Sequence, residues 1–285
     1  MKEKNKVLGG VLYLVGTPIG NLADISERAL KVLSEVDFIA AEDTRNSAKL
    51  LMALGIKKEL ISYHEHNKVT SGERIAARLL SGESCALITD AGMPAISDPG
   101  EDMVALCAES GIPVSVIPGP CAAISALALS AISTRRFVFE GFLSANKGER
   151  RKRLSELSSE IRTVIFYEAP HKLKATLADM VEAFGEDRRI SLCRELTKLN
   201  EEVIRTTVGK ANEYYSENEP RGEYVLVVEG GTEKPKEDEA LASLSPEEHI
   251  AHYAALGLSR MDAIKAAAKD RGMSKSELYK IVNKE

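Results

Sequence analysis

The chain has 285 residues, of which 44% are hydrophobic and 28% charged, and its net charge is −5. This length favours two domains with an appendage, and the composition is that of an ordinary globular protein. The charge balance gives no sign of a nucleic-acid partner, although a local basic face could still exist.

The N-terminus and the cysteines indicate a cytoplasmic protein. The opening MKEKNKVLGGVLYLVG has too short an apolar run for a signal peptide, and no window approaches the roughly 18 apolar residues of a membrane span. The four cysteines lie far apart in the sequence. We expect buried free thiols in a reducing compartment rather than disulfides or metal ligands, at Cys85, Cys107, Cys121 and Cys193.

The first part of the chain alternates strands with single helices. Strands are predicted at 11–16, 38–41, 61–63, 85–89 and 113–117, with helical apolar spacing between them. Two pairs, Asp24 with Glu27 and Thr70 with Glu73, are predicted capping boxes. This alternation predicts a mainly parallel sheet covered on both faces, in an N-terminal α/β domain over residues 10–118.

The second part has fewer helices and predicts a mixed sheet in a C-terminal α/β domain, residues 119–230. A small-residue helix is expected at 120–131, a basic helix at 147–153 and another helix at 171–184. Strands are expected at 137–142, 163–167, 189–194, 202–208 and 223–229. The polar segment 231–244 reads as a linker, and 245–285 as a small all-α tail that resembles a helix-turn-helix.

Two segments between 85 and 123 combine a strand with a loop rich in glycine and proline. CALITDAGMPAISDPG and VSVIPGPCAA each pass from an apolar strand into such a loop and then into a helix. Glycine lets a backbone approach a ligand closely, and the N–H groups at a helix start can receive acceptor atoms. Two such loops at the ends of adjacent strands predict a ligand-binding crevice.

Several common site motifs are missing. The sequence has no GxGxxG fingerprint, no Walker A motif and no GxSxG elbow, which argues against a dehydrogenase, a P-loop NTPase and a serine hydrolase. His64, Glu65 and His66 could be metal ligands, but no third ligand is near in sequence, which favours a polar loop or a substrate contact. We therefore predict no metal.

Charged residues give three further candidate sites, each with an ordinary structural alternative. Glu42, Asp43 and Arg45 follow the second strand and could form a site or only an ion pair and helix cap. The basic run between Lys147 and Arg153 could bind phosphates or be a solvated helix face. The basic tail could be a nucleic-acid module or a packing appendage.

Tyr167, Glu168 and His171 lie within five residues at another predicted strand end. An aromatic ring could stack on a purine, and the carboxylate or the imidazole could accept a proton. The alternative is a strand-to-helix turn with a core tyrosine.

Seven motifs in order resemble the tetrapyrrole methylase superfamily: LVGTPIGNLADIS, AEDTRNSAKLL, YHEHN, ITDAGMPAISDPG, VIPGPCAA, FYEAPHKL and RELTKLNEE. They cover residues 10–230. Within the superfamily they are similar to the bacterial branch that 2′-O-methylates a cytidine in the decoding centre of 16S ribosomal RNA. Two positions depart from the pattern: Cys121 stands where serine is common, and Asn200 where histidine is common. Cys121 would be a weaker hydrogen-bond partner for the cofactor.

The resemblance implies two α/β domains with S-adenosylmethionine in the cleft between them, usually in a homodimer. Carried across motif by motif, it implies cofactor contacts at Thr17, Pro18, Gly92, Met93, Pro94, Ile96, Pro120, Cys121, Ala122, Tyr167, Leu196, Tyr224 and Val225.

The implied reaction is attack of a ribose 2′-hydroxyl on the methyl group of the sulfonium, which needs alignment and a place for the proton. Asp90, Glu168 and His171 are the leading candidates for the proton acceptor, with Asp98, Glu42 and Glu195 behind them. Candidate RNA contacts are Arg45, Lys147, Arg150, Arg151, Arg153 and the tail, on 16S ribosomal RNA within the small ribosomal subunit.

Two other functions stay open from the sequence. One is a methylase of a corrinoid or porphyrin precursor, which would need a roomy cleft and gives the basic tail no purpose. The other is a non-enzymatic RNA-binding protein that keeps a relic cofactor pocket.

Overall fold

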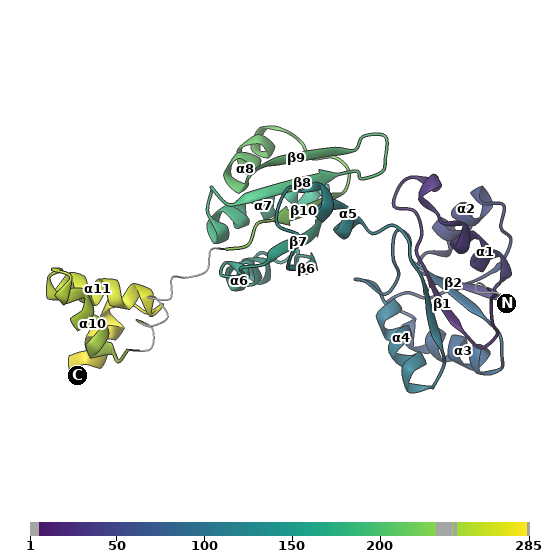
Figure 1. Cartoon of the computed structure of the whole chain (residues 1–285), viewed down its shortest axis with the longest axis horizontal. Helices are drawn as coiled ribbons and strands as arrows, with labels where there is room; N and C mark the ends of the chain where they lie inside the picture. The colour runs from purple at the N-terminus through teal and green to yellow at the C-terminus, as the bar shows by residue number, and fades with distance from the viewer. Residues whose placement is uncertain (1–5, 232–240, 242–243, 284–285) are drawn as a thin grey trace. The chain divides into compact units, whose positions relative to one another are not determined.

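The computed structural model describes residues 6–231, 241 and 244–283, and the chain divides into two compact units, Met1–Gly231 and Thr232–Glu285 (Figure 1). The first unit holds two five-stranded sheets, and the described part of the second is helical. The predicted linker 231–244 lies mostly outside the described residues. Among the described residues, no helix combines the length and the apolar character that a membrane span requires.

The first sheet is entirely parallel, with strand order β3-β2-β4-β1-β5. Its strands are β1 (Leu12–Val15), β2 (Phe38–Ala41), β3 (Glu59–Ser62), β4 (Cys85–Ile88) and β5 (Val114–Ile117). Its helices are α1 (Glu27–Glu35), α2 (Thr44–Ala53), α3 (Lys68–Leu80) and α4 (Gly100–Glu109), after a short 3₁₀ helix η1 (Leu22–Asp24). The predicted parallel sheet is confirmed.

Side chains of the three central strands, β1, β2 and β4, alternate between two cores. On β4, Ala86 and Ile88 join the core that includes residues of α1 and α2, whereas Cys85 and Leu87 join the core that includes residues of α3 and α4. Figure 1 shows α1 and α2 on one side of the sheet and α3 and α4 on the other. Because both faces are covered, these three strands are apolar throughout rather than alternately polar.

Both predicted capping boxes were wrong. The N-cap of α1 is Ser26, whose side chain accepts a hydrogen bond from the backbone N–H of Ala29, while Asp24 lies in η1. Helix α3 begins at Lys68, so Thr70 is already inside it. The predicted start lies two residues before the true N-cap in α1 and three residues after the true N-cap, Asn67, in α3.

The second sheet is mixed, as expected, with strand order β6-β7-β10-β8-β9. β6 and β7 are parallel and the other pairs antiparallel. Its strands are β6 (Phe137–Phe142), β7 (Thr163–Glu168), β8 (Arg189–Arg194), β9 (Glu202–Thr207) and β10 (Tyr224–Val228). Its helices are α5 (Ala122–Leu129), α6 (Lys147–Leu157), α7 (Pro170–Phe184) and α8 (Val208–Glu217), of which α8 was not predicted.

The two faces of the second sheet have different partners. Val164 and Phe166 of β7 pack in a core that includes residues of α6, α7 and α8. Ile165, on the alternate face, packs in a smaller core that includes residues of α5. The sheet therefore has a face covered by three helices and a face covered by one.

In the second unit, residues 244–283 contain the helices α10 (Pro246–Ala255), α11 (Arg260–Asp270) and α12 (Lys275–Asn283), which pack together. Its core contains Ile250, Ile264 and Leu278. His249 is fully buried, stacks on Tyr253 and accepts a hydrogen bond on Nδ1 from Nε of Arg271 at 3.1 Å. The expected helix-turn-helix character of the tail agrees with this arrangement.

The four cysteines are free. Cys85, Cys107 and Cys193 are buried as expected, but Cys121 is only partly buried. Burial raises the pKa of the Cys107 thiol to about 11 and also raises the pKa of Cys193. These two thiols are therefore protonated and unreactive at neutral pH.

Candidate functional site

The carboxyl ends of β1 and β4 form a switch point of the first sheet. These strands are neighbours, yet α1, which follows β1, packs on one face and α4, which follows β4, packs on the other. The loops that leave the two strands, 16–21 and 89–99, therefore diverge. Ligands of open α/β sheets bind at such points.

Three loops meet at this edge. The backbone N–H of Thr17 donates to the carbonyl of Gly92 at 2.9 Å, and the N–H of Gly92 donates back at 3.2 Å. A Cβ atom on Gly16 would lie 2.7 Å from Cα of Gly119, so these two backbones meet where a side chain cannot fit. Met93 completes the contact, because its Sδ accepts a hydrogen bond from the N–H of Gly119 at 3.3 Å.

The loop after β4 is held in an unusual backbone conformation. Ala95 and Ser97 have φ values of 67° and 64°, a region that costs a non-glycine residue of the order of 1–3 kcal/mol. The carboxylate of Asp98 accepts hydrogen bonds from the N–H groups of Ala95 (3.0 Å), Ile96 (3.1 Å) and Gly100 (2.8 Å). Asp98 therefore shapes this loop, a different role from the proton acceptor that was considered for it.

On the second sheet, five of the predicted cofactor residues share the core under α5. Leu196 and Val225 are buried in it, and the partly exposed Cys121, Ala122 and Tyr167 pack against it. Ile19, from the loop after β1, packs against the same core and connects it to the first sheet.

Tyr167 is anchored within this group. Its hydroxyl accepts a hydrogen bond from the N–H of Ala123 at 3.3 Å, and its ring lies edge-on to Phe139 with centroids 5.0 Å apart. Burial raises the pKa of the Tyr167 phenol, so it stays protonated at neutral pH. It offers an aromatic surface rather than a base.

Glu168 and Tyr224 do not join this group, because neighbouring residues of a strand point to opposite faces. The side chain of Glu168 is buried, accepts a hydrogen bond from Oγ1 of Thr176 at 2.5 Å and forms an ion pair with Lys172 at 3.2 Å. Tyr224 is buried in the core of α6, α7 and α8. Glu168 fixes the start of α7, and this placement is unfavourable for a proton acceptor.

Among the other carboxylates, Asp90 is the one that is exposed at the switch point. It accepts hydrogen bonds from the N–H of Asp43 at 3.2 Å and from Nδ2 of Asn46 at 3.0 Å, which orient it. Glu42 accepts from Oγ1 of Thr89 at 2.9 Å.

Two further candidates for proton transfer lie beside the second sheet. Glu195 accepts from Nζ of Lys198 at 2.8 Å and from the N–H of Glu223 at 3.0 Å, and these bonds lower its pKa. His171 is exposed near the start of α7.

Arg45 is at the surface beside Asp90. Its guanidinium binds Asp43 through two hydrogen bonds of 3.1 Å and 2.7 Å, yet 85% of its side chain is exposed. This ion pair lowers the pKa of Asp43. The local ion pair and the predicted helix cap are both present, because Asp43 is also the N-cap of α2.

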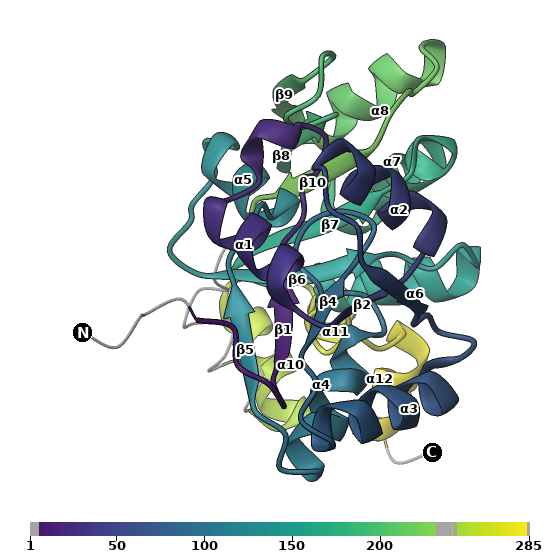
Figure 2. The same cartoon turned by 90° about the vertical axis from the view of Figure 1, so that its right-hand side faces the viewer.

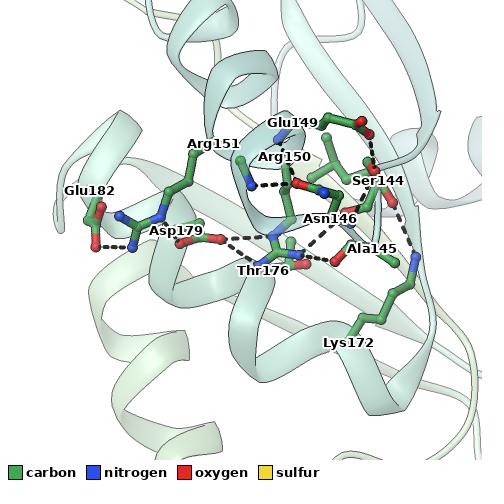
Figure 3. A network of polar contacts seen from close by, with 12 residues as sticks. Ser144, Ala145, Asn146, Glu149, Arg150, Arg151, Lys172, Thr176, Asp179 and Glu182 are labelled. Atoms are coloured by element: carbon green, nitrogen blue, oxygen red, sulfur yellow. Dashed lines mark hydrogen bonds and ion pairs between the residues drawn. The ribbon is translucent and has the colours of Figure 1, made fainter.

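The arginines of α6 are paired within the protein (Figure 3). Arg150 is 6% exposed and its guanidinium lies 2.7 Å from Asp179 of α7. It also donates to the carbonyls of Ser144 and Ala145, at 3.3 Å and 3.4 Å. This burial conflicts with the predicted RNA contact of Arg150 and gives it the structural role of holding the β6–α6 loop on α7.

The neighbouring basic residues are more accessible. Arg151 binds Asp179 and the exposed Glu182, and Arg153 binds Glu140 and Glu156. Lys147 is exposed at the start of α6. Of the run, Lys147 and Lys152, which are both exposed, are therefore the residues most available to a phosphate.

Sequence reasoning missed the two phenylalanines beside Tyr167. Phe139 and Phe142 have ring centroids 5.0 Å and 5.5 Å from that of Tyr167. Phe139 follows the alternation of its strand, but Phe142 reaches the same face only because of an irregularity in β6. Gly141, in the sequence FEGF, is the one sequence signal that could have indicated this irregularity.

Comparison with known proteins identifies the family. The family model described as Tetrapyrrole (Corrin/Porphyrin) Methylases matches residues 11–212, and the chain belongs to this family of methyltransferases. A protein of Halalkalibacterium halodurans named ribosomal RNA small subunit methyltransferase I is 49% identical over 277 residues, 97% of this chain and 96% of its own. Proteins of the same name from Bacillus subtilis and Escherichia coli O157:H7 are 47% and 45% identical to this chain. Each match covers 95% of this chain, and it covers 93% of the Bacillus subtilis protein and 94% of the Escherichia coli protein.

Solved structures agree on the fold. Cobalt precorrin-4 methyltransferase, a cobalamin biosynthetic enzyme, superposes with a TM-score of 0.58 at 17% identity, over 77% of this chain and 95% of its own. Uroporphyrin-III-C-methyltransferase from Thermus thermophilus superposes with a TM-score of 0.56 at 21% identity, over 77% of this chain and 94% of its own. The predicted fold of two α/β domains of the tetrapyrrole methylase type is confirmed.

The buried ion pair at α6 can be tested by changing Asp179 to asparagine. This leaves Arg150 buried without a counter-charge, which should lower the free energy of unfolding by about 3–5 kcal/mol, measured by urea denaturation. Glu182→Gln is the control, since this exposed partner of Arg151 should change stability by less than about 0.5 kcal/mol. Equal small losses for both variants would show that the pair does not hold the helices together.

Proposed function

We propose that the protein methylates the ribose 2′-hydroxyl of a cytidine in the decoding centre of 16S ribosomal RNA, with S-adenosylmethionine as methyl donor. The observation that carries the proposal is the similarity to proteins named ribosomal RNA small subunit methyltransferase I, which extends over 97% of the chain and so includes the second unit. The family supplies methyl transfer, and the relatives' names support ribosomal RNA as the acceptor.

The residues at the three-loop edge fit the proposed cofactor. Glycines bring the backbones of loops 16–21, 89–99 and 118–121 into direct contact, and partly exposed apolar side chains lie next to them. The adenine ring of S-adenosylmethionine can pack against such apolar side chains, and its ribose and charged amino-acid tail offer polar atoms to the backbone groups of the loops. The residues that would hold it are Thr17, Pro18, Gly92, Met93, Pro94, Ile96, Pro120, Cys121, Ala122, Tyr167, Leu196 and Val225, with Tyr224 limited to its backbone.

S-adenosylmethionine, when bound, supplies an electrophilic methyl group on a positively charged sulfur. What the protein must add is alignment of the ribose hydroxyl and a place for its proton. Asp90 is exposed at the carboxyl end of β4, and its bonds from Asp43 and Asn46 fix its orientation. We assign proton acceptance to Asp90 rather than to Glu168, and His171 stays a second candidate because it is exposed.

For RNA, we propose phosphate contacts from Arg45, Lys147, Arg151 and Arg153 and from the second unit. Lys265, Lys269, Lys275 and Lys280 are all exposed on α11 and α12. Lysines of this kind bind phosphates without reading sequence, so they would set affinity and not the choice of nucleotide.

The organisation of the molecule forms part of the proposal. We propose domains at 10–118 and 119–230, a linker at 231–244 and a tail at 245–285, and we place the enzyme in the cytoplasm with the small ribosomal subunit. A homodimer is supported by Val114 and Val116, which are 37% and 48% exposed on β5, an edge strand of the first sheet.

A tetrapyrrole precursor is the alternative acceptor, because the two solved structures with this fold are named as methyltransferases of such compounds. Their identities of 21% and 17% carry no information on the acceptor, and they leave 23% of this chain uncovered. Ribosomal RNA is favoured because the curated relatives match nearly the whole chain.

The proposal is tested with labelled S-adenosylmethionine and small ribosomal subunits from cells that lack this protein. We expect label on one ribose, located by mass spectrometry of nuclease fragments, and no label on uroporphyrinogen III. Naked 16S ribosomal RNA, run in parallel, tells whether the assembled subunit is needed. Label on the tetrapyrrole alone would establish the alternative, and label on neither would leave a non-enzymatic RNA-binding protein.

Changing Asp90 to asparagine keeps the shape of the side chain and removes its charge. If Asp90 accepts the proton, kcat should fall by about 10²- to 10⁴-fold. The Kd for S-adenosylmethionine should stay within about twofold. Glu42→Gln, on the neighbouring strand end, is the matched control, and a full rate in Asp90→Asn would show that alignment alone suffices.

Removal of residues 241–285 should weaken RNA binding more than cofactor binding. The second unit carries exposed lysines and has its own core, whereas the proposed cofactor residues all precede Gly231. Titration of both ligands against the truncated and the full-length protein decides the point, at two salt concentrations because phosphate contacts weaken with salt. Equal losses of both affinities would contradict the assignment.

A further inference from the structure

The exposed ring of Phe142 stands out from the apolar residues of the second sheet. It is 59% exposed at the end of β6, although its ring centroid lies only 5.5 Å from that of Tyr167. Large exposed aromatic side chains beside a ligand site are candidates for recognition because their exposure has no benefit for folding.

An irregularity in β6 places this ring. Phe139 pairs with Ile165, but Gly141 pairs with Phe166 and Phe142 with Tyr167, so Glu140 is the extra residue of a bulge. Without the bulge, Phe142 would sit opposite Glu168 and point to the face covered by α6, α7 and α8. The bulge turns it to the face of Tyr167. Bulges of this kind re-aim side chains beside active sites.

Glycine makes the bulge possible. Gly141 has a φ of 67°, in the region that other residues rarely adopt. A Cβ there would lie 3.1 Å from Oγ of Ser97, in the loop after β4. The bulge therefore sits directly against the loop that contains Met93 and Ile96, both of them proposed cofactor residues.

The surroundings of the ring favour a planar base attached to a phosphate chain. Nζ of Lys172 lies 5.4 Å from the centroid of Phe142 and donates to the carbonyl of Leu143 at 3.2 Å. Arg150 holds the next two carbonyls, so the segment that follows the ring is fixed at three successive positions. Lys147, exposed at the start of α6, follows this segment.

We propose that Phe142 is a stacking platform for a base of the acceptor RNA, either the methylated nucleotide or its immediate neighbour. This rests on the proposed function and identifies how that site holds its substrate. Sequence-specific proteins bind unstacked RNA bases on aromatic side chains, and such a stack holds a ribose without reading the base. The ring is preorganised, because Tyr167 supports it on one side and the bulge fixes its direction.

The first test is steady-state kinetics with small ribosomal subunits as the acceptor. Phe142→Ala and Phe142→Leu should each lower kcat/KM by about 5- to 140-fold, the range of one base–aromatic stack. Phe142→Trp should keep the activity, and all three variants should bind S-adenosylmethionine within about twofold of the parent. Phe137→Ala is the matched control, since Phe137 is 39% exposed at the other end of the same strand.

A second test observes the stack directly. The chain contains no tryptophan, so Phe142→Trp introduces a single tryptophan whose fluorescence can be excited selectively at long wavelength, and Phe137→Trp is its control. Addition of a cytidine-containing single-stranded oligoribonucleotide, with its binding followed by anisotropy of a labelled copy, should quench the first tryptophan and leave the second unchanged.

The outcomes separate this inference from the proposed function. Methylation of ribosomal RNA by the parent protein with equal rates in Phe142→Ala and Phe142→Leu overturns the platform and leaves the function standing. A parent protein inert on RNA removes both. Loss of S-adenosylmethionine affinity in Phe142→Ala would assign the ring to the cofactor. Quenching by uroporphyrinogen III alone would assign it to a tetrapyrrole, and a tryptophan signal that depends on protein concentration would assign it to a contact with a second copy of the chain.

Discussion

The pair of backbone hydrogen bonds between Thr17 and Gly92 is the contact on which the site depends. It joins the loops after β1 and β4, whose helices α1 and α4 leave the sheet on opposite faces, so the loops would otherwise separate. Gly16 and Gly119 then let the loop after β5 close against them, where a single methyl group would prevent contact. Because the contact between Thr17 and Gly92 is made by backbone atoms, it leaves the exposed side chain of Ile96 free for a ligand.

The second sheet completes the site by a separate device, the strict alternation of side chains along β7 and β10. Tyr167 and Val225 face α5, while Glu168 and Tyr224 face the larger core. One strand end therefore supplies an aromatic surface to the ligand and a buried carboxylate to the scaffold. The ion pair of Glu168 with Lys172 shows the second role, since it fixes the start of α7 and supports the segment after Phe142 through the same lysine.

The order of the elements could be predicted from the sequence, because apolar residues repeat at different intervals in strands and in helices and because glycines mark most helix ends. The prediction of helix starts failed where two neighbouring residues could each have been the N-cap. Ser26 and Asp24 both qualify as N-caps, and only the path of the chain through η1 selects Ser26. Helix α8 was missed although its buried residues Val208, Ala211 and Tyr215 have helical spacing. The positions of the proposed cofactor loops could be predicted, because glycine and proline are concentrated there. The directions of the Glu168 and Phe142 side chains depend on strand register, and sequence motifs alone do not give the register.

The basic run of α6 shows why a charge pattern alone is a poor guide to function. Arg150, Arg151 and Arg153 resemble a phosphate-binding face, yet each has carboxylate partners on α7, β6 or α6 itself. Arg150 in particular is removed from solvent, and its remaining donors hold the carbonyls of Ser144 and Ala145. Of the three, Arg150 is the one that fixes the segment that follows Phe142. If Phe142 stacks on an RNA base, as we propose, a charge substitution at Arg150 should disturb the placement of that base through the loop, although the guanidinium itself is buried.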